Sequence, residues 1–284
     1  MNISPRIILA SAALALLAAF YLLVPQAGQR SYPPPGVASW VYQKTLPVIE
    51  CPEPSGLVLR EDRGSFLIVD DGARDRPGGV YEYDMAGRLI RSNQIGGDLE
   101  GITYHPKRKS YFVVNERKDL VLELSAADLK PVAEYRLPER FRGEPLVEPG
   151  GNGLEGITFQ PDPDAPGGGY LWLANQDDPP LLIKTTLPAE GSTLTVHATL
   201  PMPGLNLGGL FYDPASQLIW VSHAWQNLVS LVDPKTLRVV DWQVLPGYAQ
   251  EGISLDREGR LWIASDLGGV SIYRPRPSRR GEGR

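Results

Sequence analysis

The sequence predicts an all-β fold, a five-bladed β-propeller closed by an N-terminal strand, on three observations. A segment that begins with an acidic or small residue followed by Gly recurs five times, and its anchoring glycines lie 45, 55, 53 and 43 residues apart. Each repeat divides into short runs of strand length, bounded by turn residues. A period of 40 to 50 residues with four short strands per unit is typical of propeller blades.

Each copy of the segment starts with an acidic or small residue and Gly, and it ends in a pair that is mostly polar. The five copies span residues 55–71, 100–116, 155–176, 208–224 and 251–266. In a propeller, every copy of one position points toward the same axis. Carboxylates that are far apart in sequence should therefore converge in space.

Strands are expected where apolar and β-branched residues alternate between turns. In the first two units they are expected at 56–60, 65–70, 79–83, 89–92, 101–105, 110–115, 121–125 and 132–137. In the third and fourth units they are expected at 156–160, 170–174, 181–185, 194–200, 209–213, 218–222, 228–232 and 239–245. The fifth unit has only three, at 252–256, 261–265 and 270–273.

The missing fourth strand of the fifth unit has a candidate at the other end of the domain. Residues 40–48 precede the first unit and have the composition of a strand. If this segment pairs as the outer strand of the last blade, the ring closes and no sheet edge is left open. A sixth blade in the loop 138–152 is the main alternative, but that stretch is too short and too rich in Gly, Pro and Glu.

The second strand of every unit carries a large apolar side chain at one aligned position. These side chains are Leu67, Phe112, Trp172, Trp220 and Trp262. Period-2 alternation places them on one face of each sheet. We interpret them as packing between neighbouring blades rather than as a platform on which a ligand stacks.

Composition excludes some classes of function. The chain has 284 residues, a net charge of −5 and 42% hydrophobic residues, so a packed core is expected and nucleic acid is not an expected partner. Residues 274–284 are predicted to be a disordered basic tail. The single cysteine, Cys51, permits no intramolecular disulfide.

The N-terminus is predicted to be a membrane segment. Residues 7–24 are apolar except for Ser11, and Arg6 precedes them. We favour an uncleaved signal-anchor helix over residues 1–25, with a cleaved signal peptide as the alternative. A Pro- and Gly-rich linker, residues 26–39, would join it to the propeller at 40–273. The expected location is a bacterial inner membrane, crossed once, with the propeller in the periplasm.

The innermost strand of a blade begins, and the second strand ends, on the same face of a propeller. The acidic residues at these positions should therefore surround one opening. The candidate metal ligands are Glu100, Glu155, Glu251, Glu116, Asp71 and Asp266. The side chains expected to line the opening beside them are Asp70, Asn115, Asn175, Gln176 and His223.

Several carboxylates near one axis repel one another unless some are protonated or a cation lies between them. Oxygen ligands in loose geometry favour Ca²⁺ over Mg²⁺, and three histidines in the whole chain make zinc a poor fit. His223 is interpreted as lining the pore rather than as a catalytic base. The alternative for the glutamates is that they only accept backbone N–H groups from the adjacent blade.

Four runs resemble one known family: residues 99–104, 112–117, 153–157 and 250–254, with Glu-Gly-Ile in three of them. They resemble the SdiA-regulated (YjiK-like) proteins over about residues 40 to 273. The resemblance implies a five-bladed propeller related to NHL repeats, with bound Ca²⁺, and no settled activity. The same short motifs occur in esterase-like phytase domains and calcium-dependent lactonases. In the fourth unit Gly208 replaces the acid, so that blade should contribute no carboxylate from its first strand.

We favour the first of two functions and keep the second as the alternative. The first is a membrane-anchored propeller that binds Ca²⁺ and presents a surface to a small-molecule ligand or a protein partner. The second is a Ca²⁺-dependent hydrolase of an ester, lactone or phosphoester, in which the metal would polarise the scissile group. The chain contains no Gly-x-Ser-x-Gly motif, so a metal-dependent route is the enzymatic one that the residues support.

Overall fold

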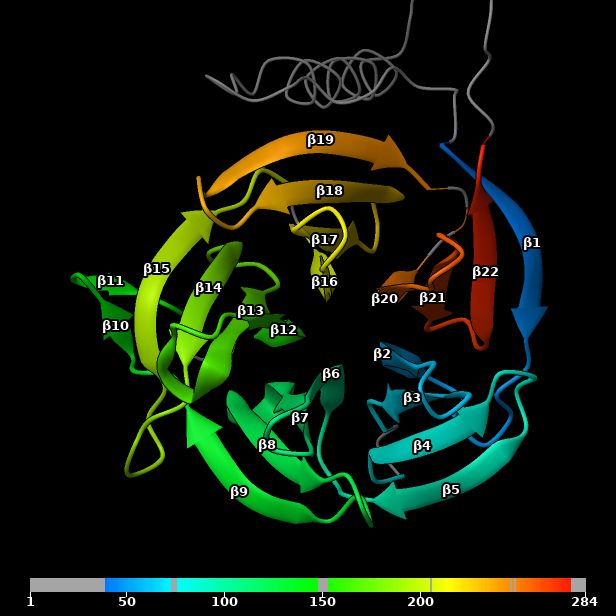
Figure 1. Ribbon diagram of the computed structural model, residues 1–284, viewed down its shortest axis with the longest axis horizontal. Coiled ribbons are helices and arrows are strands. Elements are labelled where there is room, and N and C mark those ends of the chain that lie inside the picture. Colours follow the sequence, from blue (N-terminus) through cyan, green and yellow to red (C-terminus); the bar gives the residue numbers. More distant parts are fainter. Residues whose placement is uncertain are drawn as a thin grey trace, which may run out of the picture. The chain divides into compact units, whose positions relative to one another are not determined.

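The computed structural model describes residues 39–72, 76–147, 153–204, 206–245, 247 and 249–276. Within these residues, five four-stranded antiparallel sheets stand around a common centre, with β2, β6, β12, β16 and β20 innermost (Figure 1). In four of these sheets the chain runs from the inner strand outward, and in the fifth the outermost strand is β1. The predicted five-bladed, all-β propeller is therefore confirmed.

The strands of the first two blades are β2 (Pro54–Arg60), β3 (Ser65–Asp70), β4 (Gly79–Asp84), β5 (Leu89–Gln94), β6 (Leu99–His105), β7 (Ser110–Asn115), β8 (Leu120–Ser125) and β9 (Pro131–Arg136). Those of the next two are β12 (Leu154–Pro161), β13 (Gly169–Asn175), β14 (Leu181–Thr186), β15 (Thr195–Pro201), β16 (Leu207–Asp213), β17 (Leu218–His223), β18 (Leu228–Asp233) and β19 (Arg238–Val244). Blade five comprises β20 (Gln250–Leu255), β21 (Leu261–Ser265), β22 (Val270–Pro275) and β1 (Trp40–Leu46).

The N-terminal strand closes the ring, as predicted. β1 pairs antiparallel with β22, from Trp40 opposite Pro275 to Leu46 opposite Val270 (Figure 1). The Trp40 indole N–H also donates to Gln243 Oε1 at 2.9 Å, which ties β1 to the outer strand of blade four. The closure gives the last blade four strands, the same number as in the other blades.

The core is divided into five apolar clusters, and each one lies between two neighbouring blades. Alternate side chains of one strand serve different clusters: Leu67 packs against blade two, and Phe66 packs against blade five. The five aligned second-strand residues are all buried, each in the cluster shared with the following blade. Their predicted role in packing between blades is confirmed.

No sixth blade is found in the described part of the loop after β9. That part contains a small hairpin of β10 (Arg140–Phe141) and β11 (Glu144–Pro145). Two short 3₁₀ helices, η1 (Glu116–Lys118) and η2 (Pro166–Gly168), lie in other loops. None of the described helices has the length and hydropathy needed to cross a bilayer. The predicted signal-anchor helix, the linker up to residue 38 and the basic tail beyond residue 276 lie outside the described residues. The first two residues of the predicted tail, Arg274 and Pro275, belong to β22 and pair with β1.

The repeated glycine is required by contact between inner strands. A Cβ on Gly56 or Gly101 would come closer than 3.0 Å to the carbonyl oxygen of Glu100 or Glu155, one blade further on. The same relation holds at the remaining three copies and ends at Gly252, which lies against the Ser55 carbonyl of blade one. The glycines therefore allow five inner strands to approach one another around the centre.

Candidate functional site

The inner strands begin, and the second strands end, at one end of the propeller, which we call the mouth. In blade two, the Glu116 N–H that follows β7 donates to the Asp98 carbonyl that precedes β6, at 2.9 Å. Equivalent bonds join Gln176 to Gly153 in blade three and Asp266 to Ala249 in blade five. These bonds place the polar residue after each second strand beside the start of the inner strand.

A β-bulge sets the position of each acidic residue on an inner strand. In blade two, Leu99 is opposite Asn115 and Ile102 is opposite Val113, so Glu100 and Gly101 together face a single residue of β7. The same irregularity occurs in the other four blades. A bulge bends the strand and redirects a side chain out of the regular alternation. It lets neighbouring glutamates meet although their strands lie in different blades.

The carboxyl groups meet in pairs. Glu155 of blade three contacts Glu100 of blade two, and both are buried. Glu251 contacts Asp266 within blade five. In blade one, Asp71 contacts Glu53. Glu100 also interacts electrostatically with Glu116, Glu251 and Asp71, so the pairs are joined into one acidic network.

Burial raises the pKa of the acidic groups in this network. For Glu100 and Glu155 the pKa lies well above the ordinary value, first because of burial and then because of neighbouring carboxylates. Burial, followed by Asp266, raises the pKa of Glu251 to about 8. Burial, followed by Glu53, raises the pKa of Asp71 to about 8. Each of these groups resists ionisation unless a positive charge is supplied.

Two compact groups of carboxyl groups are found among the described residues, one at the boundary between blades one and two and the other within blade one. Ligand oxygens of Asp71, Asp98 and Glu100 lie within 4.8 Å of one another, and so do those of Glu53, Asp70 and Asp71. Asp71 belongs to both groups. Sequence reasoning missed Glu53 and Asp98, which stand two residues before the repeated position in their blades. Their position two residues before the repeat could have identified them. In other blades the carbonyl at this position accepts the N–H of the residue that follows the second strand, so the position lies at the mouth.

Two arginines border these groups. Arg76 Nη2 lies 2.9 Å from Asp70 Oδ1 and 3.4 Å from Glu53 Oε2. Arg117 Nη2 lies 3.4 Å from Asp98 Oδ2. In the part of the chain that the structure describes, the Asp71–Asp98–Glu100 group has one arginine at its outer edge, whereas Arg76 already neutralises part of the other group.

Several carboxylate oxygens have no hydrogen-bond donor among the described residues. They include Asp71 Oδ1 and Glu251 Oε2, and the Glu251 side chain is at least nine-tenths buried. An acceptor buried without a donor loses its hydration without compensation. A cation among these oxygens would supply that compensation.

Glu116 has a different environment from the other predicted ligands. It begins η1, and its Oε1 accepts the Gly153 N–H of blade three at 3.0 Å. Burial raises its pKa, and the Gly153 N–H offsets part of the rise. One oxygen of Glu116 thus accepts a backbone N–H from the adjacent blade. This is the role that the sequence offered as the alternative to metal binding for the glutamates.

Asp70, Asn115 and Asn175 lie beneath the loops of the mouth, and all three are almost fully buried. Asp70 Oδ1 accepts the Gly72 N–H at 2.9 Å, and the Asn175 amide donates to the carbonyls of Asp177 and Pro179. These side chains organise the loops that carry the acidic network. Gln176, half-buried, connects blades three and four through its backbone, since its carbonyl accepts the Leu207 N–H.

The prediction that His223 lines the pore is wrong. Its Nε2 lies 2.9 Å from Ser230 Oγ on β18, and its ring packs against Trp242 on β19. His223 is fully buried inside blade four. The contacts with Ser230 and Trp242 hold its side chain among the strands of its own blade.

Residues 52–197, just over half of the chain, match the family described as "Phytase-like: Esterase-like activity of phytase". The chain belongs to this phytase-like family. The matched stretch runs from the start of blade one into β15 and contains both compact groups of carboxylates. In this phytase-like propeller, Glu251 and Asp266 come from blade five, beyond the match.

The likeness to a solved glutaminyl cyclase supports the fold of this phytase-like propeller, and two further likenesses are weaker. The crystal structure of Myxococcus xanthus glutaminyl cyclase has a TM-score of 0.60 at 13% identity, over 83% of this chain and 95% of that one. A protein of unknown function from Bacteroides caccae has a TM-score of 0.48 at 10% identity, over 75% and 69% of the two chains. The Cps50 (Swd1) β-propeller domain of Myceliophteria thermophila has a TM-score of 0.45 at 12% identity, over 81% and 65%. No curated protein matches the sequence.

Proposed function

We propose that the mouth binds Ca²⁺ and that the chain hydrolyses an ester there. The observation that carries this proposal is the Asp71–Asp98–Glu100 group, whose ligand oxygens lie within 4.8 Å of one another. Asp71 Oδ1 has no donor among the described residues. The description of the family, esterase-like activity, supports hydrolysis over binding alone.

The donor set suits Ca²⁺. All candidate ligands are oxygens, and they come from loops and bulges of several blades, which fits the loose geometry and high ligand number of Ca²⁺. Zinc prefers nitrogen and sulfur ligands. The histidines are engaged elsewhere: His105 stacks on Phe159, His197 bonds Thr186, and His223 bonds Ser230.

When bound, Ca²⁺ would polarise the scissile ester group and stabilise the negative charge that develops on its oxygen. The residues around it have distinct tasks in this proposal. Loss of hydration raises the pKa of Asp266 to about 6, and its contact with Glu251 offsets part of the rise. A carboxylate with a pKa near the working pH is suited to accept a proton from water. Arg117 orients Asp98.

A Ca²⁺-binding propeller that presents a surface to a ligand or protein is the second candidate. It is favoured by large apolar side chains that are exposed on loops at the mouth: Ile49, Trp225 and Leu267. Such side chains are common in recognition surfaces. Both candidates need the cation, and they differ in whether a bound ester is cleaved.

The likeness to the SdiA-regulated proteins and the membrane anchor at residues 1–25 are part of the proposal. An apolar run after Arg6 supports an anchored chain with the propeller in the periplasm. Millimolar Ca²⁺ is available outside the cytoplasm, so a site of modest affinity would still fill there.

The test combines metal analysis with an activity assay. The purified full chain is dialysed against Ca²⁺ and its metal content measured, and p-nitrophenyl acetate and p-nitrophenyl phosphate are assayed with Ca²⁺ or with EGTA. We expect bound Ca²⁺ and hydrolysis that EGTA abolishes. The double variant Glu155→Gln, Glu251→Gln should lose both. Bound Ca²⁺ without turnover of either compound would favour the binding candidate, and absence of Ca²⁺ would overturn both.

A further inference from the structure

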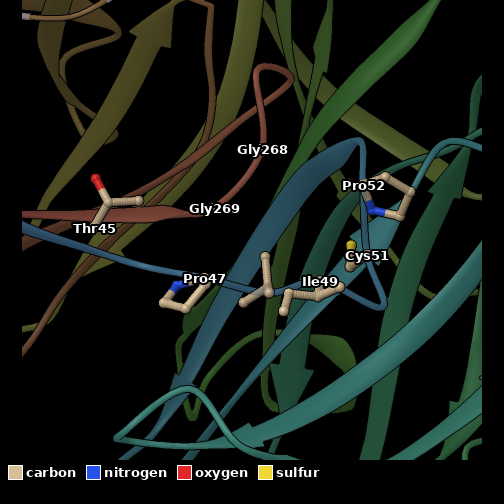
Figure 2. Close-up of a pocket in the computed structure, with 8 residues that line it drawn as sticks. Thr45, Pro47, Ile49, Cys51, Pro52, Gly268 and Gly269 are labelled. Carbon is tan, nitrogen blue, oxygen red and sulfur yellow. The ribbon is translucent and has the colours of Figure 1, made fainter.

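A pocket of about 430 Å³ opens between the β1–β2 connection and the β21–β22 turn (Figure 2). It is lined by Thr45, Pro47, Val48, Ile49, Cys51, Pro52, Gly268 and Gly269. In Figure 2 the turn with Gly268 and Gly269 faces the segment with Ile49, Cys51 and Pro52. The lining offers no charged side chain.

The two segments that form the pocket also carry acidic residues of the mouth. Glu53 directly follows Pro52, and Asp266 stands two residues before Gly268. The Cys51 side chain contacts Asp70, and its Sγ lies 3.7 Å from the Val69 carbonyl oxygen. Cys51 is therefore both a wall of the pocket and a neighbour of the acidic network, so the two features are adjacent.

The rim of the pocket is apolar and accessible. Ile49 is 84% exposed, and Leu267, which adjoins Gly268, is 74% exposed. Side chains this apolar gain free energy when a ligand covers them. A ligand that reaches the mouth with one polar end can place an apolar end between these two segments.

The charge around the mouth restricts what that ligand can be. In the part of the chain that the structure describes, carboxyl groups there far outnumber the arginines, and Arg76 already pairs with Asp70 and Glu53. One divalent cation would leave the region acidic. A ligand with several phosphates would be repelled, whereas a neutral ester would not.

We infer that the pocket receives the apolar group of a neutral carboxylic ester or lactone, which is the substrate class of the mouth. This inference rests on the proposed ester hydrolysis and deepens it. The step consumes one water: the water oxygen bonds to the acyl carbon, the bond from that carbon to the alcohol oxygen breaks, and one water proton passes to the leaving alcohol. The pocket contributes by holding the apolar group while the acyl carbon lies at the acidic network.

The pocket has room for a chain of several carbons, since sites for small molecules start near 300 Å³. Each CH₂ transferred from water into an apolar site contributes up to about a four-fold gain in binding. The preference should therefore increase with chain length and then stop when the pocket is full.

The test is a series of p-nitrophenyl esters from acetate to octanoate, with p-nitrophenyl phosphate, assayed with the full chain in Ca²⁺. We expect kcat/KM to rise from acetate to hexanoate and to exceed that of the phosphate. Ile49→Ser should lower the hexanoate-to-acetate ratio of kcat/KM about five-fold, and Ile49→Leu should restore it. Val132→Ser is the matched control, because Val132 is 60% exposed on the outer strand of blade two and should leave the ratio unchanged.

A flat dependence on chain length, or a preference for the phosphate, would overturn this inference while leaving Ca²⁺-dependent hydrolysis intact. If no ester is cleaved, the proposed function fails and the pocket is tested separately with N-phenyl-1-naphthylamine, a neutral apolar dye that fluoresces when bound. Binding that Ile49→Ser weakens and Val132→Ser does not would support the pocket. Dye binding that Ile49→Ser leaves unchanged, or the absence of dye binding, would overturn the proposed role of the pocket.

Discussion

The carboxylate of Glu251 in blade five lies against Gly208 in blade four. A Cβ at position 208 would come within 2.9 Å of Glu251 Oε2 and 3.0 Å of Ser222 Oγ. Glycine at this position therefore leaves room for a neighbouring buried carboxylate. Blade four, which contributes no acid from its inner strand, accommodates the acid of blade five.

Gly208→Ala should lower Ca²⁺ affinity by about ten-fold, because the added methyl group displaces the Glu251 carboxylate. The atoms in its way belong to side chains that can move, so the free energy of unfolding of the metal-free protein should change by less than about 1 kcal/mol. Isothermal titration with Ca²⁺ and urea unfolding in EGTA measure the two quantities. Unchanged Ca²⁺ affinity would mean that Glu251 is not part of the site.

Gly252→Ala should mainly lower the free energy of unfolding, in contrast to Gly208→Ala, which should mainly lower Ca²⁺ affinity. Its Cβ would collide with the Ser55 carbonyl oxygen and with the backbone of Gly56 and Leu57, where blade five meets blade one. Backbone atoms cannot move away from the added methyl group by a rotamer change. We therefore expect a loss of about 3 kcal/mol or more in the free energy of unfolding. Urea unfolding of this variant beside Gly208→Ala makes the comparison. Equal stability of the two variants would contradict the proposed packing of the inner strands.

Asp98→Asn tests the one residue of the Asp71–Asp98–Glu100 group that the sequence pattern did not include. The amide keeps the shape of the side chain but removes a charge from the Asp71–Asp98–Glu100 group, so Ca²⁺ affinity should fall about ten-fold or more. Asp128→Asn, in an exposed loop after β8, is the matched control and should leave the affinity unchanged. If both variants bind Ca²⁺ like the wild type, the cation is not held by this group.

The sequence pattern predicts the backbone of the propeller better than the direction of its polar side chains. Blade count, closure by β1 and packing at Trp172 or Trp262 follow from repetition and period-2 alternation, which depend on position along a strand. The meeting of Glu100 with Glu155 also follows from the repeat.

The rest depends on contacts that periodicity does not encode. Asp98 joins the site because its carbonyl receives the Glu116 N–H, which brings a loop residue next to Glu100. His223 occupies the same register position as Asn115 and Asn175, yet its ring bonds Ser230 and packs on Trp242 in its own blade. The direction of a side chain at a strand end is set by its partners, and these differ between blades.

Without a cation, the protein should become less stable as the pH rises. The pKa values of Asp71 and Glu251 are raised from 3.8 and 4.5 to about 8 in the folded state. Between these limits the folded protein binds more protons than the unfolded chain, so the free energy of unfolding falls with increasing pH and the loss is complete above about pH 8. Bound Ca²⁺ replaces those protons, so its affinity should increase over the same range.

Thermal unfolding from pH 5 to pH 9, in metal-depleted buffer and with Ca²⁺, measures both effects. The melting temperature should decrease with pH in the first series, and Ca²⁺ should remove most of that decrease. Glu251→Gln should flatten the metal-free series, because the amide does not titrate. A melting temperature that rises with pH without metal would show that these carboxyls are not protonated in the folded protein.

The central claim, a Ca²⁺ site at the mouth, is tested most directly by thermal unfolding of the full chain in EGTA and then in increasing Ca²⁺, with Mg²⁺ as the control. We predict a rise that tracks Ca²⁺ concentration and corresponds to about 2.7 kcal/mol at one hundred times Kd. Mg²⁺ should shift the transition less, because it demands stricter octahedral geometry. An identical melting temperature in EGTA and in millimolar Ca²⁺ would contradict the claim.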